Sequence, residues 1–276
     1  MNSPATIVTR DRLEQAAETG DNPEAMNALA EFLIRDWTPP DYAEARRWFE
    51  RSVERGNVHA MACLGAVLTQ TNPPELVEAC ALLSKAAEAG HVEALVNLGS
   101  LLVTLDPPQP DKAVECWRIA AVRGGTQLLR DLGDHLAMVY PDRARLCWEV
   151  VADTGDLWSI NALGRLLAMS NPPDFDAARR WLEKAAATGD VVSMNNLGNV
   201  LLRVNPPRVA EAKRMWEQAA GAGNADAMAN LSDFYARADP PDPVIARLWL
   251  ERAASAGHSA AKASMIALYG KRTSYI

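Results

Sequence analysis

The stretch from Gly155 to Gly189 reads GDLWSINALGRLLAMSNPPDFDAARRWLEKAAATG and contains two amphipathic segments separated by a break. Apolar residues in each half recur at three- and four-residue spacing, which is typical of a helix with one buried face. Asn171-Pro172-Pro173 breaks the helix because proline lacks an amide hydrogen and disfavours the helical conformation in the preceding residue. Asp174 follows as the expected N-cap. A lone hairpin leaves its apolar faces in water, so neighbouring copies must cover them.

Copies of this hairpin recur with a period near 34 residues. A glycine ends each second helix, and successive glycines are 36, 34, 34, 31, 34, 34 and 34 residues apart. A fixed period of this length is the signature of stacked helical hairpins. The glycines are Gly20, Gly56, Gly90, Gly124, Gly155, Gly189, Gly223 and Gly257.

Large and small residues hold fixed places in the repeat. Leucine and a small residue stand eight and nine residues after most of the glycines, as in Leu163-Gly164. An alanine pair stands four and three residues before most of the glycines, as Ala185-Ala186 does before Gly189. We expect the small residues to let paired helices approach closely and the large ones to fill the space between them. The large residues are Trp48, Leu82, Trp117, Trp148, Trp181, Trp216 and Trp249.

These patterns predict one all-α array of about seven stacked antiparallel helical hairpins with a half-repeat at each end. We expect the array to cover residues 8–270, after a flexible lead at 1–7 and before a mobile tail at 271–276. Its first helix, from about Thr9 to Thr19, is expected to cap the N-terminal end. The tail ends in Ser274-Tyr275-Ile276, which is either a recognised C-terminal peptide or, as we prefer, a solvated end.

The fourth hairpin, residues 125–155, is three residues shorter than the others and keeps a single proline, Pro141. Two interpretations remain open. The shortening divides the array into two segments, or it is a neutral deletion in a surface turn, which we prefer.

Composition limits the classes of function. The formal net charge of −7 argues against a nucleic-acid or anionic-membrane partner, because such partners need a basic surface. The N-terminal residues lack the apolar core of a signal peptide and no window has the length of a membrane span, so we expect a cytoplasmic protein. The four cysteines (Cys63, Cys80, Cys116 and Cys147) show no C-x-x-C or cysteine–histidine spacing, so we expect buried thiols, no metal and no cofactor.

The 34-residue hairpin, the Leu-Gly pair and the pattern Trp-x-x-x-Ala-Ala-x-x-Gly from Trp181 to Gly189 resemble the Sel-1-like repeat family. These repeats belong to the tetratricopeptide-like α-solenoids. The resemblance extends from about Leu13 to Tyr269 and implies a right-handed superhelical α-solenoid. It also implies a non-catalytic scaffold or adaptor that binds a peptide or protein partner on its concave side.

In such a solenoid the first helix of each hairpin lines the inner face, so its polar residues are the candidates for partner binding. Asparagine amides can bind an extended peptide backbone, and arginine can bind a carboxylate through two hydrogen bonds. The alternative is that a hydrated helix face simply carries Asn and Arg. The candidates are Arg130, Asp134, Trp158, Asn161, Arg165, Asn195, Asn199 and Arg203.

Two aromatic residues of these helices have more than one interpretation. Trp158 is either an exposed contact for a partner or a side chain that packs over the shortened hairpin. His135, with Asp131 and Asp134 nearby, is either part of a hydrolase-like site or, as we prefer, a partly buried structural residue. No catalytic residue is assigned, because the sequence contains no known catalytic motif.

The sequence therefore favours a monomeric interaction scaffold that binds a protein or an extended peptide. The alternatives are a self-assembling repeat protein and an enzyme acting through residues near His135. The sequence identifies neither the partner nor the pathway.

Overall fold

The structure is a computed structural model that describes residues 3–19 and 22–270, with side chains as far as residue 267. It is all-α: the described residues form helices joined by short turns and contain no strand. The helices are stacked hairpins, as the sequence predicts. The chain divides into two compact units, Met1–Leu136 and Ala137–Ile276. The boundary lies in the shortened fourth hairpin.

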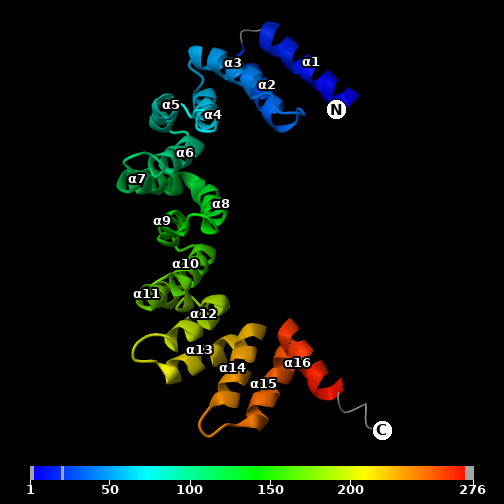
Figure 1. Cartoon of the computed structure of the whole chain (residues 1–276), viewed down its shortest axis with the longest axis vertical. Helices are drawn as coiled ribbons and strands as arrows, with labels where there is room; N and C mark the ends of the chain where they lie inside the picture. The colour runs from blue at the N-terminus through cyan, green and yellow to red at the C-terminus, as the bar shows by residue number, and fades with distance from the viewer. Residues whose placement is uncertain (1–2, 20–21, 271–276) are drawn as a thin grey trace. The chain divides into compact units, whose positions relative to one another are not determined.

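In the first unit α1 packs on α2, and the pairs α2–α3, α4–α5 and α6–α7 form hairpins, as the first of them shows in Figure 1. Neighbouring hairpins meet through α3–α4 and α5–α6. The first helix of each hairpin also contacts the next one, α2 with α4 and α4 with α6. The elements are α1 (Pro4–Thr19), α2 (Pro23–Arg35), α3 (Tyr42–Glu54), α4 (Val58–Leu68), α5 (Leu76–Glu88), α6 (Val92–Leu102), α7 (Pro110–Ala120), the π-turn η1 (Ala121–Gly125) and α8 (Thr126–Ala137).

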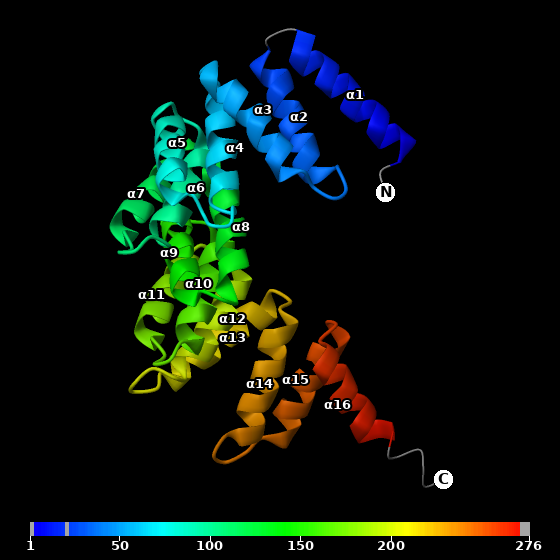
Figure 2. The ribbon, with the colours of Figure 1, turned by 45° about the horizontal axis from the view of Figure 1, so that its top comes forward.

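In the second unit α9 packs on α10, and the hairpins are α10–α11, α12–α13 and α14–α15, the last of them clear in Figure 2. The last helix packs on α15. The elements are α9 (Pro141–Ala152), α10 (Leu157–Met169), α11 (Phe175–Ala186), α12 (Val191–Leu201), α13 (Val209–Gly221), α14 (Ala225–Arg237), α15 (Pro243–Ser255) and α16 (Ser259–Gly270).

The first helix begins earlier than the sequence indicates. It starts at Pro4 instead of near Thr9, so residues 4–7, which the sequence assigned to a flexible lead, form its first turn. The tail Ser274-Tyr275-Ile276 lies outside the described residues.

The turn glycines adopt the backbone conformation for which glycine is needed. Gly189 has φ of 92°, and its N–H donates to the carbonyl of Ala186 at 3.0 Å. This left-handed conformation ends a helix at little cost only where no Cβ is present. The same sign of φ occurs at seven of the eight glycines named from the sequence, and Gly20 lies outside the described residues.

The predicted N-cap is confirmed at Asp174, which accepts the backbone N–H of Ala177 at 2.8 Å. Asp41 and Asp242 cap their helices in the same way, and each accepts a backbone N–H bond at 2.9 Å. The Glu44 carboxylate binds Arg10 at 2.8 Å, so it does not complete a capping box with Asp41.

A second set of caps directly follows the turn glycines and was not identified from the sequence. Their side chains accept N–H bonds at the start of each following first helix, which satisfies donors that the helix itself leaves unpaired. They are Asn57, His91, Asp156, Asp190, Asn224 and His258.

The Leu-Gly pairs form the tight contacts that the sequence predicts. A Cβ at Gly198 would lie 2.7 Å from Cδ1 of Trp216, and one at Gly99 would lie 2.7 Å from Cδ1 of Trp117. At Gly65 and Gly164 the neighbours are Leu83 and Leu182, at 2.7 and 2.8 Å from such a Cβ. The sequence predicts Leu82 and Trp181 for these contacts, each one residue too early in the chain. The residue seven positions before the turn glycine, and not the eighth, packs against the glycine of the Leu-Gly pair.

The cysteines are less buried than predicted. Cys147 is buried, whereas Cys63, Cys80 and Cys116 are half-buried, and all four are free thiols. Burial raises the pKa of Cys147 to about 12, so this thiol stays protonated at neutral pH.

Candidate functional site

A groove of about 1000 Å³ lies on the second unit, across the first helices α10, α12 and α14. We call it the three-helix groove. Apolar parts of Leu182, Trp216 and Phe234 contribute to its wall, and Trp216 and Phe234 meet edge-to-face with ring centroids 6.2 Å apart. Gly164 of α10 also lines the groove, and the absence of a Cβ there leaves room for the Leu182 side chain. A mostly apolar hollow with a few polar groups at its edges is typical of a binding site.

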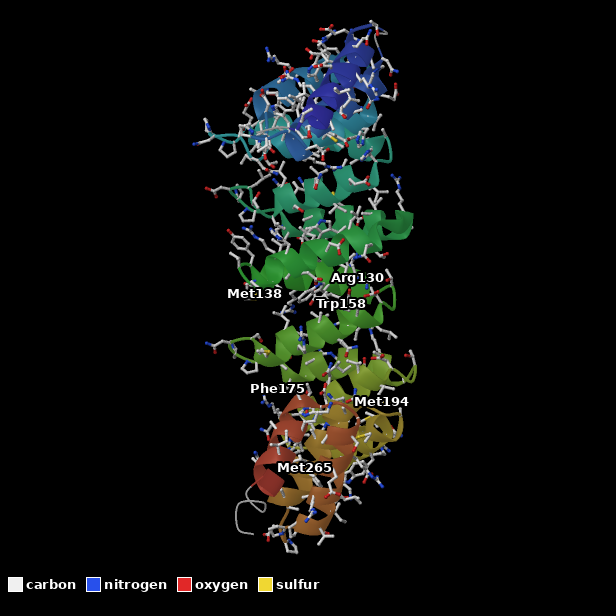
Figure 3. The ribbon with its side chains drawn as sticks, turned by 90° about the vertical axis from the view of Figure 1, so that its right-hand side faces the viewer. Arg130, Met138, Trp158, Phe175, Met194 and Met265 are labelled. Atoms are coloured by element: carbon white, nitrogen blue, oxygen red, sulfur yellow. The ribbon has the colours of Figure 1, made fainter. Side chains whose placement is uncertain are left out.

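Three arginines line this groove: Arg165 from α10, Arg203 from the turn that follows α12, and Arg237 from the end of α14. None of the three has a carboxylate within 4.0 Å among the described residues, although Arg203 lies 6.0 Å from the ring of Phe175 (labelled in Figure 3). Asp233 and Asp239 also line the groove, which leaves a formal charge of +1. A locally positive groove on a chain of net charge −7 can attract a carboxylate.

Asparagine amides join the three helices beneath the groove. Asn196 Nδ2 donates to Asn161 Oδ1 at 2.8 Å, and Asn230 Nδ2 donates to Asn195 Oδ1 at 2.9 Å. The Oδ1 atoms of Asn196 and Asn230 accept no hydrogen bond from the described residues, and both residues line the groove. Amide orientations follow from this network of donors and acceptors. The free carbonyl oxygens can therefore accept from an incoming N–H group.

The structure brings together only some of the residues predicted as the site. Arg165, Asn199 and Arg203 are exposed and line the three-helix groove. Asn195 is only 6% exposed, and its backbone carbonyl accepts from the indole N–H of Trp216 at 3.2 Å, so it holds the helices together instead of facing the groove.

Asn161 likewise serves the contact between repeats. Its Nδ2 donates to the Asp190 carboxylate at 3.0 Å and to the carbonyl of Leu157 at 2.9 Å. Burial raises the pKa of Asp190, but the hydrogen bonds from Ser193 and Asn161 outweigh burial and lower the pKa overall. The ionised carboxylate therefore both caps α12 and binds α10.

Arg130 and Asp134 stand on α8 of the first unit and do not line the groove. Trp158, labelled in Figure 3, lies on α10 and packs on the shortened hairpin, and its role as a partner contact stays a prediction. It packs edge-to-face on Trp148 of α9, with ring centroids 5.9 Å apart, and stays 42% exposed. It thus covers the second helix of the shortened hairpin and leaves an aromatic face in solvent.

The sequence analysis did not select Asn196, Asn230, Asp233, Phe234 and Arg237, which also line the groove. Counted from the turn glycines, the polar members stand at positions 7, 10 and 14. This spacing defines one helix face, so a stricter use of the helical period would have found them.

His135 is exposed on α8, whereas the sequence predicted a partly buried side chain. Its neighbour Asp131 accepts a hydrogen bond from Gln127 at 2.7 Å. The described residues give His135 no hydrogen bond to a carboxylate or a nucleophile, so the geometry offers nothing in favour of a hydrolase-like site.

The fold and the groove define an α-helical repeat protein of the solenoid class. The sequence matches the Sel1 repeat family over more than half of its length, at residues 23–57, 73–91, 92–124, 159–190 and 225–258, and the chain belongs to this family. Sel1 repeat proteins generally serve as protein-interaction scaffolds and are typically not enzymes. No helix among the described residues is long and apolar enough to span a bilayer.

Similar solved structures are themselves helical repeat proteins or immunity proteins. A Sel1 repeat protein from Oxalobacter formigenes is 25% identical over 94% of this chain and 80% of its own, with a TM-score of 0.45. A protective antigen of uropathogenic Escherichia coli with an SLR fold is 22% identical over 95% and 67%, with a TM-score of 0.43. An immunity protein from Pseudomonas aeruginosa is 21% identical over 73% and 82%, with a TM-score of 0.38. No curated protein matches the chain.

Proposed function

We propose that the three-helix groove binds an extended, acidic segment of a protein partner. The observation that carries this proposal is a row of three arginines, Arg165, Arg203 and Arg237, above a partly apolar wall; none of them has a carboxylate partner in the part of the chain that the structure describes. A guanidinium binds a carboxylate through two parallel hydrogen bonds, which provides direction as well as attraction.

The asparagines complete the recognition. Asn199 is exposed in the groove, and the Oδ1 atoms of Asn196 and Asn230 are open acceptors. An extended peptide presents an N–H and a C=O group at every residue, so amide side chains can bind it without reading its sequence. The arginines would then select segments with acidic side chains or a terminal carboxylate.

Selection of peptides from a random library on the full-length chain tests this function. We expect enrichment of Asp and Glu, and we expect each change of Arg165, Arg203 or Arg237 to Ala to weaken a selected peptide about tenfold, or about 1.4 kcal/mol. Arg180→Ala is the matched control, because Arg180 is an exposed arginine of α11 outside the groove. Helical circular dichroism checks that each variant is folded.

Two results would contradict the proposal. One is a selected set without acidic enrichment. The other is a peptide that binds the triple arginine variant as tightly as it binds Arg180→Ala.

A further inference from the structure

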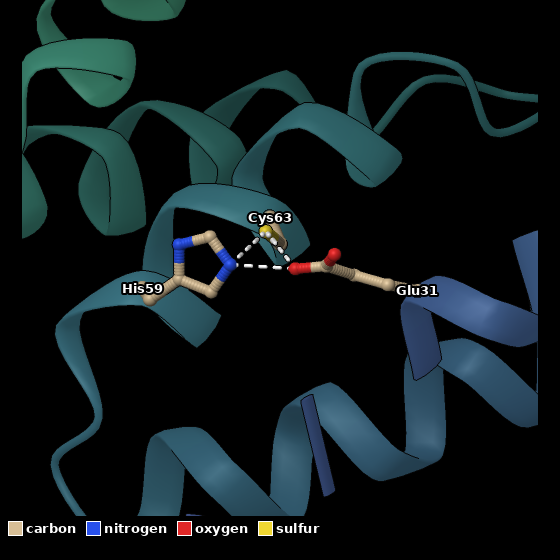
Figure 4. A group of neighbouring side chains, drawn as sticks. All are labelled: Glu31, His59 and Cys63. Atoms are coloured by element: carbon tan, nitrogen blue, oxygen red, sulfur yellow. Dashed lines mark hydrogen bonds and ion pairs between the residues drawn. The ribbon is translucent and has the colours of Figure 1, made fainter. Parts of the chain in front are cut away.

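Three side chains of different chemistry meet in the first unit, far from the three-helix groove in sequence. His59 and Cys63 stand one turn apart on α4, and Glu31 reaches them from α2 (Figure 4). His59 Nε2 lies 2.6 Å from Glu31 Oε1 and 3.5 Å from Cys63 Sγ, and Sγ lies 4.0 Å from the same Oε1. The spacing His-x-x-x-Cys places two ligand types on one helix face, and the sequence analysis overlooked it.

The three donor atoms suit Zn²⁺ in kind and in separation. Zinc binds thiolate sulfur at about 2.3 Å, imidazole nitrogen at about 2.0–2.1 Å and carboxylate oxygen at about 2.0–2.2 Å. Tetrahedral angles then place sulfur about 3.6 Å from both nitrogen and oxygen. The observed 3.5 and 4.0 Å are close to these values, and the nitrogen–oxygen pair needs to open by less than 1 Å.

A second histidine orients the first. His91 Nε2 lies 3.1 Å from His59 Nδ1, and the two rings are tilted by 38° with centroids 5.3 Å apart. His91 Nδ1 accepts the N–H of Ala94 at 3.3 Å and also lies 3.3 Å from Glu93 Oε2. A metal-bound imidazole is typically held through its other nitrogen in this way.

Tautomers decide how this pair would respond to a metal. With the proton of His91 on Nε2, His59 accepts at Nδ1 and donates from Nε2 to Glu31. With the His91 proton on Nδ1, the His59 proton moves to Nδ1 and leaves Nε2 free to coordinate. In this tautomer His91 Nδ1 gives up the N–H bond from Ala94 and donates to Glu93 Oε2, 3.3 Å away.

The surroundings balance the charge of a divalent ion. Glu31 supplies one oxygen to the cluster, and its other oxygen lies 3.6 Å from the Arg35 guanidinium. Glu93 lies on the opposite side of His91. Two carboxylates and a thiolate against one guanidinium give a local charge of −2, which Zn²⁺ neutralises. The His59 side chain is 48% exposed, so water can reach a fourth position.

We propose that Glu31, His59 and Cys63 form a Zn²⁺ site with one open coordination position, and that His91 is a positioning residue for His59. Binding converts the Cys63 thiol to a thiolate and releases one proton to solvent. Because the ligands come from α2 and α4, the ion links two neighbouring repeats of the first unit.

The test uses the full-length chain after treatment with a chelator, with ZnCl₂ as the titrant in calorimetry and CoCl₂ as a spectroscopic probe. We expect one Zn²⁺ per chain and, with Co²⁺, the near-ultraviolet charge-transfer band of a thiolate ligand. Cys63→Ser and Glu31→Gln should weaken Zn²⁺ binding by about 100-fold or more, and His91→Gln by about 10- to 100-fold, as for other lost outer-shell partners.

Cys80→Ser is the matched control, because Cys80 is a half-buried thiol of the same unit outside the cluster. It should bind Zn²⁺ as the unmodified chain does. A Co²⁺ spectrum without the thiolate band overturns the proposal on the unmodified chain, whatever the variants do. Zn²⁺ binding of equal strength in Cys63→Ser also overturns it, since the ion then sits elsewhere, for example near His258 and Asp226, which are 3.5 Å apart.

Discussion

The contact between Gly198 and Trp216 offers the sharpest test of how the repeats pack. Trp216 is 3% exposed and lies flat against α12, and its indole N–H donates to the carbonyl of Asn195 at 3.2 Å. A Cβ at position 198 would lie 2.7 and 2.8 Å from Cδ1 and Cε2 of that ring. Gly198→Ala therefore forces the indole to move, since the helix backbone cannot.

Three contributions set the size of the effect. Overpacking a filled core costs about 1–3 kcal/mol. Displacing the ring strains or breaks the indole hydrogen bond, and a buried donor left unpaired costs about 1–3 kcal/mol. Alanine returns about 1 kcal/mol, because it favours the helix more than glycine does. We expect a net loss of about 2–3 kcal/mol, or about 5–10 °C in melting temperature.

Thermal unfolding followed by circular dichroism at 222 nm measures this loss. Gly221→Ala is the matched control, because Gly221 is the last residue of α13 and a Cβ there meets nothing within 4 Å. The control should be neutral or slightly stabilising. If Gly198→Ala melts at or above the temperature of Gly221→Ala, the close contact does not shape the hairpin and the packing argument is wrong.

Two further changes probe the turns. Hydrogen bonds lower the folded-state pKa of Asp190, so its charge stabilises the fold above the unfolded pKa and this contribution disappears as the pH falls through the folded pKa. Asp190→Asn should therefore lose about 1 kcal/mol at pH 7 in urea unfolding and nothing at pH 2–3; an equal loss at both pH values would contradict the assignment. Gly189→Ala, at φ of 92° with open space around it, should cost about 1–2 kcal/mol by backbone strain alone, and an unchanged urea midpoint would exclude that strain.

The sequence predicts the hairpins well because their ends depend on local chemistry. A turn glycine such as Gly189 and an N-cap such as Asp174 are needed for local structures that few other residues form. Such residues therefore recur in successive hairpins, and their period near 34 residues predicts the array. Core assignment depends on finer geometry. Trp181 and Leu182 are both large and apolar, and the helical period does not separate adjacent residues, so the sequence points to the wrong one at Gly164.

The site is less predictable for the same reason. Asn195 and Asn196 are identical neighbours, yet Asn195 is buried between helices and Asn196 lines the groove. One residue of rotation, about 100°, separates the two roles. Arg165 and Arg203 were found because long charged side chains stay at the surface in any register. The zinc cluster joins Glu31 to His59, 28 residues away, and only the stacking of α2 on α4 brings them together.

The asparagine ladder also decides which variants can report on binding. Asn161 and Asn195 fix the amides of Asn196 and Asn230 and thereby aim their free oxygens at the groove. Replacing either one by alanine leaves a half-buried amide without its partner and removes a hydrogen bond between two first helices, so weaker binding by such a variant does not separate contact from positioning. Arg165, Arg203 and Arg237 make no hydrogen bond of this kind among the described residues, and for that reason their loss can locate a partner in the groove.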